Sequence, residues 1–269
     1  MVAFADALDR RVFQKLVSER VVSNVLPPMI ETLKQSVASE LQNGRMSQIL
    51  ASVEIRNTLA AQARSTQFRI SGAARTSPFG RRDEFERPIF SSDDGALLIM
   101  LKQAKAVFLD RIRLALDGSD LCQHPPFYPS SSRNAYMLTS APCAMLLPGM
   151  LVPPFVSDRF DEQSLYGRIG FVIAHEIAHV ASKQNLWNMQ TAAVILANYT
   201  SSTWLEAAAD LAAADAIVAT GMLSSQQTCE HVSQLWCART PDGYFEISGQ
   251  THPPANLRGD EICRFLAVR

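Results

Sequence analysis

The sequence predicts an α+β fold that consists mostly of helices. Apolar residues recur at helical spacing over much of the first 70 residues, and residues 203–220 form an alanine-rich segment that stops at Gly221. Residues 133–156 instead mix aromatic and apolar residues with prolines, which favours short strands and loops. A chain of 269 residues is long enough to bury one large core or two smaller ones.

The elements of the N-terminal part follow directly from composition. Residues 5 to about 70 are predicted to be helical. Residues 69–94 then shift to glycine, serine, proline and charge, which indicates an extended connector. We therefore expect a helical region with its connector over residues 1–94.

The remaining residues, 95–269, are expected to form a second domain. It opens with a long helical pattern over residues 95–116, which Asp117 and Gly118 end. After the strand-rich segment, residues 164–184 predict a further helix, and the tail from Trp236 is expected to be rich in loops.

Charge and hydropathy exclude several classes of protein. The formal net charge is −1, so no overall field attracts nucleic acid or an anionic membrane. No segment reaches the roughly 20 apolar residues of a membrane span, and Asp6 interrupts the N-terminus too early for a signal peptide. The five cysteines include no C-x-x-C pair, and their pairing is not readable from the sequence.

The segment FVIAHEIAHVASK, residues 171–183, predicts a metal site. Residues four apart project from one face of a helix, so His175 and His179 can bind one ion, and Glu176 can reach a water molecule on that ion. The alternative, two histidines on a helix without a metal, is the commoner fate of any single histidine. The H-E-x-x-H spacing favours zinc.

A catalytic zinc ion takes three protein ligands and keeps one position open. Glu206, on the next strongly helical segment, is the best candidate for the third ligand. Asp210 lies one turn later and could accept the second N–H group of a ligand histidine. The alternative, two exposed acids on a surface helix, is less attractive because apolar residues flank both; for Asp215 it is the default expectation.

These motifs resemble those of the neprilysin family of zinc metallopeptidases, which includes the endothelin-converting enzymes. HEIAH and EAAAD match the family's zinc signature, Asn134-Ala135-Tyr136 resembles its N-A-F/Y strand, and residues 251–258 resemble its H-x-P-x-N-x-R tail. The resemblance is strong over residues 133–269 and loose before them. It implies a thermolysin-like catalytic core, over residues 95–269, with an N-terminal helical region.

The resemblance also implies a role for each matching residue. His175, His179 and Glu206 would bind one zinc ion per chain, and Glu176 would be the general base that activates water. Asp210 would orient His175, and Arg258 would hold a substrate carbonyl group. His252 would donate a hydrogen bond to the oxyanion of the tetrahedral intermediate.

Peptides are the substrates that the resemblance implies. Asn134 and Ala135 would bind the peptide backbone as an added strand. An apolar pocket would select cleavage on the amino side of a bulky hydrophobic residue, although core packing explains Met150 and Phe171 equally well. The pocket positions that match the family are Met150, Phe155, Phe171, Val172 and Trp236.

Three departures from the family keep an alternative open. Most of the family's large capping domain has no counterpart, the segment between HEIAH and EAAAD is short, and Ser182 stands where the family often has an aspartate. The orienting partner of His179 is therefore undetermined. The alternative is a catalytically impaired relative that keeps zinc for structure or for partner binding.

A thermolysin-like protease or an aminopeptidase is a further alternative, which the tail motif and the N-A-Y strand disfavour. The resemblance places the protein outside the cell or at the cell surface, and the sequence does not indicate an oligomeric state.

Overall fold

The N-terminal part of the structure is a pair of packed helices. The structure, a computed structural model, describes residues 17–70, 134–138, 142–182, 184–200, 203–235 and 255–268, with isolated positions at 95, 98, 101, 102, 105 and 122. A π-helical turn, η1 (Val21–Val25), leads into the long helix α2 (Leu26–Asn43). The 3₁₀ turn η2 (Arg45–Ile49) follows, and then α3 (Val53–Ser65), whose first turn Ser52 caps by accepting the Ile55 N–H.

A small sheet joins distant parts of the chain. Its strands are β1 (Gln67–Ile70), β2 (Ala135–Leu138) and β3 (Cys143–Leu146), in the order β1-β3-β2. β1 pairs with β3 in parallel, with Gln67 opposite Cys143, and β2 pairs with β3 antiparallel, with Ala135 opposite Leu146. Every residue of the central strand β3 is buried.

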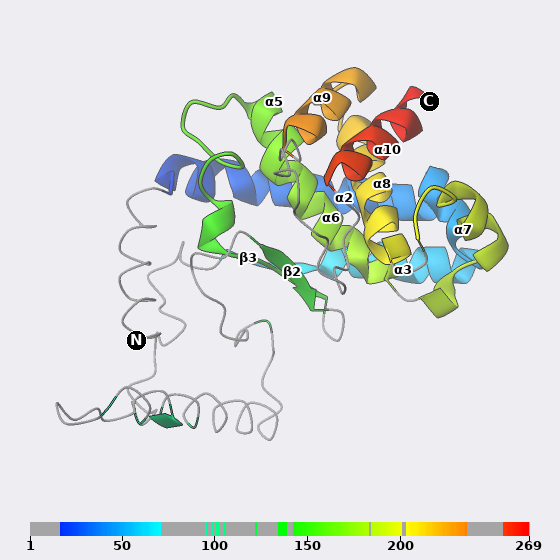
Figure 1. Cartoon of the computed structure of the whole chain (residues 1–269), viewed down its shortest axis with the longest axis horizontal. Helices are drawn as coiled ribbons and strands as arrows, with labels where there is room; N and C mark the ends of the chain where they lie inside the picture. Colours follow the sequence, from blue (N-terminus) through cyan, green and yellow to red (C-terminus); the bar gives the residue numbers. More distant parts are fainter. Residues whose placement is uncertain are drawn as a thin grey trace.

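The remaining elements form a helical layer. The short turn η3 (Pro148–Met150) precedes a continuous helical run made of α5 (Glu162–Leu165), the π-helical η4 (Tyr166–Gly170), α6 (Phe171–Ala178) and the 3₁₀ turn η5 (His179–Ala181). The chain then forms η6 (Gln184–Leu186), α7 (Met189–Ile195), α8 (Trp204–Ala219), α9 (Ser225–Leu235) and α10 (Ala255–Ala267). Figure 1 shows α6 and α8 crossing at the centre of the molecule, with α9 and α10 beside them.

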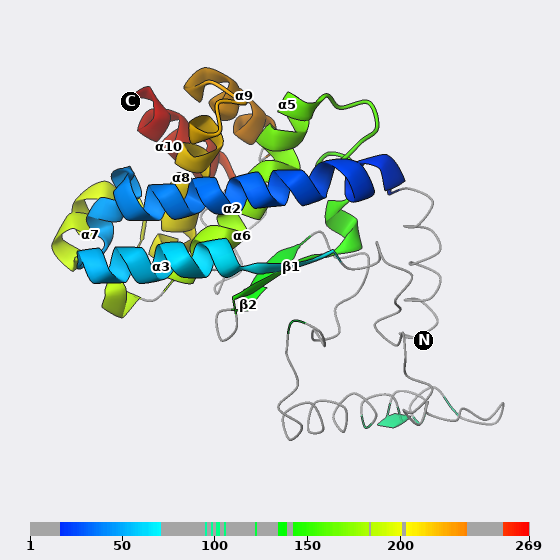
Figure 2. The same cartoon turned by 180° about the vertical axis from the view of Figure 1, so that it is seen from behind.

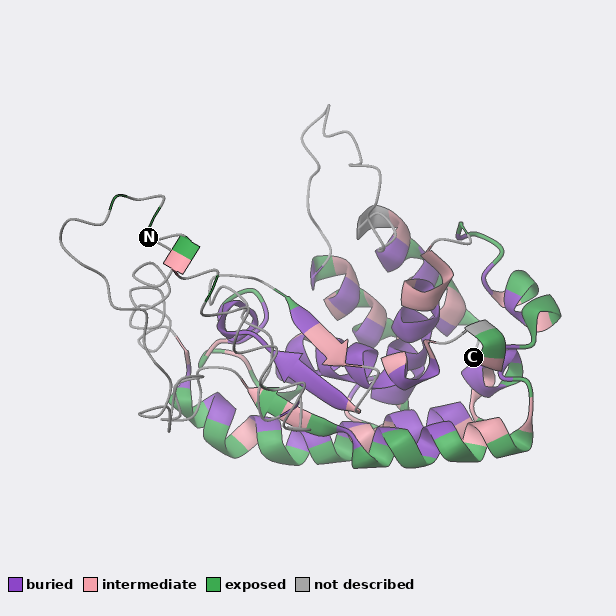
Figure 3. Ribbon diagram, turned by 90° about the horizontal axis from the view of Figure 1, so that it is seen from below, coloured by how far each residue is buried: buried purple, intermediate pink, exposed green. Residues whose placement is uncertain are grey.

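The core lies between the N-terminal helices and this layer. Figure 2 shows α2 and α3 side by side across one face of the molecule, and α2 contacts both α6 and α8. One continuous apolar cluster includes residues of all these helices. Figure 3 shows buried residues on the inward sides of the helices, and in the sheet they concentrate on the central strand β3. The helix that holds the two histidines is therefore buried from several directions.

Alanines and one glycine explain how α8 fits into this core. Ala207–Ala209 and Ala212–Ala214 are all buried, and their small side chains let the α8 backbone approach α6 closely. Gly221, just beyond the C-terminus of α8, has a φ angle of +75°, a conformation that glycine adopts without strain. The predicted end of this helix is confirmed.

The structure corrects three sequence predictions about elements. Residues 67–70 form a strand rather than the end of a helix, because pairing with β3 outweighs the local helical pattern. The helix predicted over residues 164–184 runs from Glu162 to Ala181. The tail is not entirely loop, since α10 buries Ile262 and Leu266 one turn apart. The helix predicted over residues 95–116 lies mostly outside the described residues.

Two disulfides fix parts of this fold. Cys122 pairs with Cys143 at the start of β3, and Cys229 pairs with Cys263 between α9 and α10. Within the described ranges, no helix combines the length and apolar character that crossing a bilayer requires.

Candidate metal centre

Three side chains from two helical segments converge at the centre of the molecule. His175 comes from α6, His179 begins η5, and Glu206 lies in the first turn of α8. The Nε2 atoms of the two histidines are 3.0 Å apart, and Glu206 Oε2 lies 3.2 Å from His175 Nε2 and 3.4 Å from His179 Nε2. The three groups offer one ligand atom each, and these three atoms lie close to one another.

This triangle fits a tetrahedral zinc ion. Zinc binds histidine nitrogen and carboxylate oxygen at about 2.0–2.2 Å, which places neighbouring ligand atoms of a tetrahedron roughly 3.3 Å apart. The three measured separations, 3.0, 3.2 and 3.4 Å, bracket that value. Two imidazoles and one carboxylate are also the donor set that leaves a fourth position open on a catalytic zinc ion.

Asp210 and Arg258 lie behind His175. Asp210 Oδ1 is 2.8 Å from His175 Nδ1, and its side chain is fully buried on α8, one turn after Glu206. Arg258, from the first turn of α10, donates Nε to Asp210 Oδ2 at 2.7 Å and Nη2 to Asp210 Oδ1 at 2.6 Å. A fork-shaped ion pair of this kind holds both groups in one orientation.

These contacts shift the pKa values of Asp210 and His175. Burial tends to raise the pKa of Asp210, but the Arg258 and His175 charges outweigh burial and lower the pKa to about 2. Burial likewise tends to lower the pKa of His175, and the Asp210 carboxylate overrides it and raises the pKa to about 10. The metal-free His175 is therefore protonated at neutral pH, and a metal ion has to displace that proton.

Glu176 adjoins the centre on α6. It follows His175 directly and is 6% exposed, so the carboxylate lies in the buried interior rather than at the surface. The alternative of exposed acids fails for Asp215 as well as for Asp210. Asp215 is 1% exposed and forms a fork-shaped ion pair with Arg45, at 3.0 Å and 2.6 Å.

The predicted substrate residues lie around β2 and the start of α6. Asn134 precedes β2 and accepts the Ala135 N–H with its side-chain oxygen at 3.0 Å. The four pocket residues that lie within the described part of the chain are buried, and their exposed fractions range from 0% for Phe171 to 8% for Phe155, with Met150 and Val172 between them. In this structure they pack in the core. His252 and Trp236 lie outside the described residues.

Three residues near the centre make contacts that were not predicted from the sequence, although Ser182 was noted as standing where the family often has an aspartate. Ser182 Oγ lies 2.7 Å from His179 Nδ1, and the Trp187 indole N–H donates to the Ala181 carbonyl oxygen at 2.9 Å. Tyr199 is buried near Asp210 and Arg258, and burial raises the pKa of its hydroxyl. The spacing of Ser182, three residues after His179, was the available signal for the first of them.

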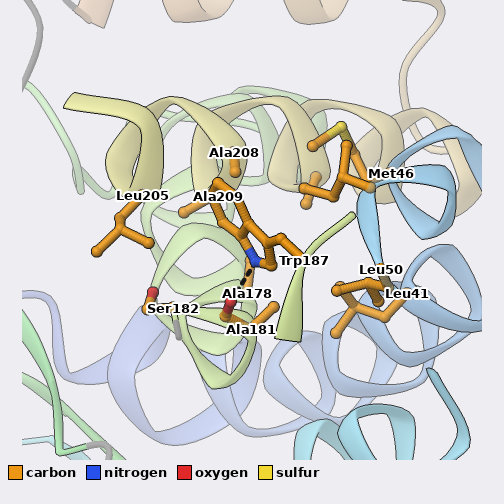
Figure 4. A pocket seen from close by; sticks show the side chains of 12 residues that line it. Leu41, Met46, Leu50, Ala178, Ala181, Ser182, Trp187, Leu205, Ala208 and Ala209 are labelled. Carbon is orange, nitrogen blue, oxygen red and sulfur yellow. Dashed lines mark hydrogen bonds between the residues drawn. The ribbon is translucent and has the colours of Figure 1, made fainter. Parts of the chain in front are cut away.

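A small apolar cavity lies behind the ligand helices. Figure 4 shows it between Ala178, Ala181 and Ser182 on one side and Ala208 and Ala209 of α8 on the other. Its volume is about 10 Å³, which is room for no more than one water molecule. The cavity is a packing defect between alanine-rich helices and is too small for a peptide.

Comparisons with known proteins agree with this centre. Residues 134–208, which include β2, β3 and all three candidate ligands, match the family model described as Peptidase family M13. No curated protein matches the sequence.

Two solved structures share the fold. The zinc metalloprotease Zmp1 of Mycobacterium tuberculosis, solved in complex with an inhibitor, aligns with a TM-score of 0.64 and 16% identity over 93% of this chain. PepO of Lactobacillus rhamnosis HN001 aligns with a TM-score of 0.68 and 15% identity over 96% of this chain. The aligned part is 44% and 45% of those two proteins, so the chain spans less than half the length of either. The segment that carries the candidate ligands is thus similar to the M13, or neprilysin, family of peptidases, and the described part of the chain shares its fold with these two proteins.

Proposed function

We propose that this chain hydrolyses short peptides as a zinc-dependent endopeptidase. The observation that carries the proposal is the triangle of His175, His179 and Glu206, whose ligand atoms are 3.0–3.4 Å apart. Zinc bound there would act as a Lewis acid and would lower the pKa of a coordinated water molecule to about 7. Zmp1, which shares the fold, is described as a zinc metalloprotease.

Glu176 is the general base of this proposal. Its position next to His175 on α6 places a carboxylate beside the ligands without making it one of them. It accepts a proton from the attacking water molecule and returns a proton to the leaving amine. Asp210 accepts the Nδ1–H group of His175 at 2.8 Å, which directs Nε2 towards the metal, and Arg258 keeps that acceptor ionised.

The sheet edge supplies the proposed peptide-binding surface. Among the described strands, β2 stands at one end of the order β1-β3-β2, and an extended peptide binds by adding a strand at such a position. Asn134 and Ala135 at the start of β2 would bind the peptide backbone. Met150, Phe155, Phe171 and Val172, together with Trp236, would select a bulky hydrophobic residue on the carboxyl side of the cleaved bond. His252 would donate a hydrogen bond to the oxyanion, and Arg258 would hold a substrate carbonyl group.

We also propose that the protein works outside the cell or at its surface. The Cys122–Cys143 and Cys229–Cys263 disulfides support this location, because such bonds persist in oxidising compartments.

Metal analysis combined with cleavage of a peptide library tests the proposal. The wild-type protein should contain one zinc ion per chain and should cleave before bulky hydrophobic residues. Glu176→Gln keeps the size of the side chain and removes the base, so this variant should bind zinc as the wild type does and lose most of its activity. The proposed function is wrong if the Glu176→Gln variant is as active as the wild type.

The same experiment separates the alternative. A protein that binds one zinc ion per chain and cleaves no peptide would be a catalytically impaired relative that keeps the metal for structure or for partner binding. A protein that binds no zinc would exclude both functions.

A further inference from the structure

The two ligand histidines have different partners on their second ring nitrogen. His175 faces the buried carboxylate of Asp210, whose charge Arg258 balances. His179 instead lies 2.7 Å from the hydroxyl oxygen of Ser182, through Nδ1. The Nε2 atom of His179 is the one that points at the other two ligand atoms.

We propose that Ser182 is the positioning residue of His179, with a neutral hydroxyl in the role that Asp210 plays for His175. A histidine that binds metal through Nε2 carries its proton on Nδ1, so Nδ1–H donates and Ser182 Oγ accepts. This contact fixes both the ring orientation and the tautomer in which Nε2 is free for the metal. The inference rests on the proposed zinc site.

The local backbone accounts for the contact. At η5 the chain changes from α-helical to 3₁₀ geometry, and Ser182 N–H donates to the His179 carbonyl oxygen at 3.0 Å. In a 3₁₀ turn, residues three apart lie one above the other, which brings the Ser182 hydroxyl over the His179 ring. The spacing of three residues and the 3₁₀ geometry of the turn together account for the contact.

The turn is held in place from the N-terminal part of the fold. The Trp187 indole N–H binds the Ala181 carbonyl oxygen, as the dashed line in Figure 4 shows. Trp187 itself pairs with Leu50, and the flanking residues exchange two further backbone bonds with residues 49 and 51, at 2.6 Å and 2.9 Å. Trp187 and its contacts with residues 49–51 therefore hold the backbone of the turn that contains Ser182.

The choice of a neutral acceptor affects the charge of the centre. The Asp210–Arg258 pair adds no net charge, and Ser182 adds none either, so Glu206 is the negatively charged ligand that faces the metal directly. An aspartate at position 182 would add one more carboxylate to the carboxylates of Glu206 and Glu176 and would form a stronger, charge-assisted bond to His179. Serine orients the ring without that added charge.

Zinc titration of position-182 variants tests the inference. The dissociation constant is measured by competition with a chromophoric chelator, and the visible spectrum of the cobalt-substituted protein reports the ligand geometry independently of catalysis. Ser182→Ala should weaken zinc binding about 10–100-fold and alter the cobalt spectrum. Ser182→Thr keeps the hydroxyl and should retain both properties, and Ser182→Asp should bind zinc more tightly than the wild type.

Ser36→Ala is the matched control. Ser36 on α2 donates its hydroxyl to the Ala216 carbonyl oxygen at 2.6 Å, so this variant also loses one partly buried hydroxyl bond, but away from the ligands. It should leave the dissociation constant and the cobalt spectrum unchanged. The inference alone is overturned if Ser182→Ala keeps its zinc affinity and cobalt spectrum, as Ser36→Ala should. It is also overturned if Ser182→Thr loses both properties as Ser182→Ala does. A wild-type protein that binds no zinc overturns the proposed function and this inference together.

Discussion

Arg258 donates two hydrogen bonds to the buried carboxylate of Asp210, at 2.7 Å and 2.6 Å. The same carboxylate lies 2.8 Å from Nδ1 of the ligand His175. A residue of the C-terminal helix α10 therefore determines the charge and orientation of the group that directs a metal ligand on α6. The C-terminal helix therefore contributes to the surroundings of the candidate metal centre, although it supplies none of the three candidate ligands.

Arg258→Met is expected to destabilise the protein and to weaken zinc binding. The variant keeps an apolar stem but removes one of the two cations that face the buried Asp210 carboxylate, and breaking a buried ion pair costs about 3–5 kcal/mol. Chemical unfolding of the metal-free protein gives the stability change, and chelator competition gives the zinc affinity. An Arg258→Met protein as stable as the wild type would show that this pair does not act as described.

Arg45→Met is the control for that prediction. Arg45 forms the same fork-shaped pair with Asp215, on the same helix α8, and also binds the Phe265 carbonyl oxygen at 2.6 Å. Asp215 is not one of the three candidate ligands, and it follows Glu206 by nine residues on α8. This variant should lose stability and keep its zinc affinity, which separates an effect on the metal centre from general destabilisation.

The arrangement of the candidate ligands was easier to predict from sequence than the sheet was. His175, His179, Glu206 and Asp210 lie on two helices, and helical periodicity alone determines which residues share a face. The strand β1 was mistaken for helix because its partner β3 lies more than 70 residues further along the chain. Long-range partners also misled the expectation for Asp215, because its burial depends on Arg45, 170 residues away in sequence.

Ser182 and Trp187 illustrate a different limit. Both residues make their contacts at the turn after α6, where the helix changes to 3₁₀ geometry. Trp187, which follows η6, donates its indole N–H to the Ala181 carbonyl oxygen in that turn. Helical spacing places Ser182 near His179 but does not predict the Trp187 contact, since that contact depends on how the helix ends. The resemblance to the family pointed to position 182, where the family often has an aspartate, but it left the partner of His179 undetermined because serine stands there.

Trp187→Phe should loosen the turn that carries Ser182. Phenylalanine fills most of the same space but removes the N–H group that binds the Ala181 carbonyl oxygen, and the loss should cost about 1–3 kcal/mol. Hydrogen exchange at the Ser182 amide, which binds the His179 carbonyl oxygen, should become faster. Trp204→Phe also loses an indole bond to a backbone carbonyl group, that of Tyr199 at 3.1 Å, and should not change exchange at Ser182. Equal exchange rates in both variants would contradict the prediction.

Removing the Cys229–Cys263 disulfide should destabilise the region that presents Arg258. The bond joins α9 to α10 across a sequence separation of 34 residues, and a loop of that length corresponds to about 3–4 kcal/mol in the chain-entropy model. The double variant Cys229→Ser/Cys263→Ser should therefore unfold at a lower temperature. Its zinc affinity should fall at temperatures where α10 begins to separate from α8. An unchanged unfolding temperature would contradict the prediction.

Zinc binding by the metal-free protein should release a proton and should strengthen as the pH rises. The pKa of His175 is raised from 6.5 to about 10, chiefly because the Asp210 charge overcomes the effect of burial. The stabilisation from this proton is complete below pH 6.5 and is lost as the pH rises through about 10.

Zinc needs the neutral imidazole, so between these limits each ion displaces one proton from His175, and the affinity should rise about tenfold per pH unit. Calorimetric titration between pH 6 and 8, in buffers of different ionisation enthalpy, counts the released protons. In Asp210→Asn the main cause of the raised pKa is gone, so this variant should release fewer protons at pH 8. Equal proton release by the variant and the wild type at that pH would exclude Asp210 as the cause.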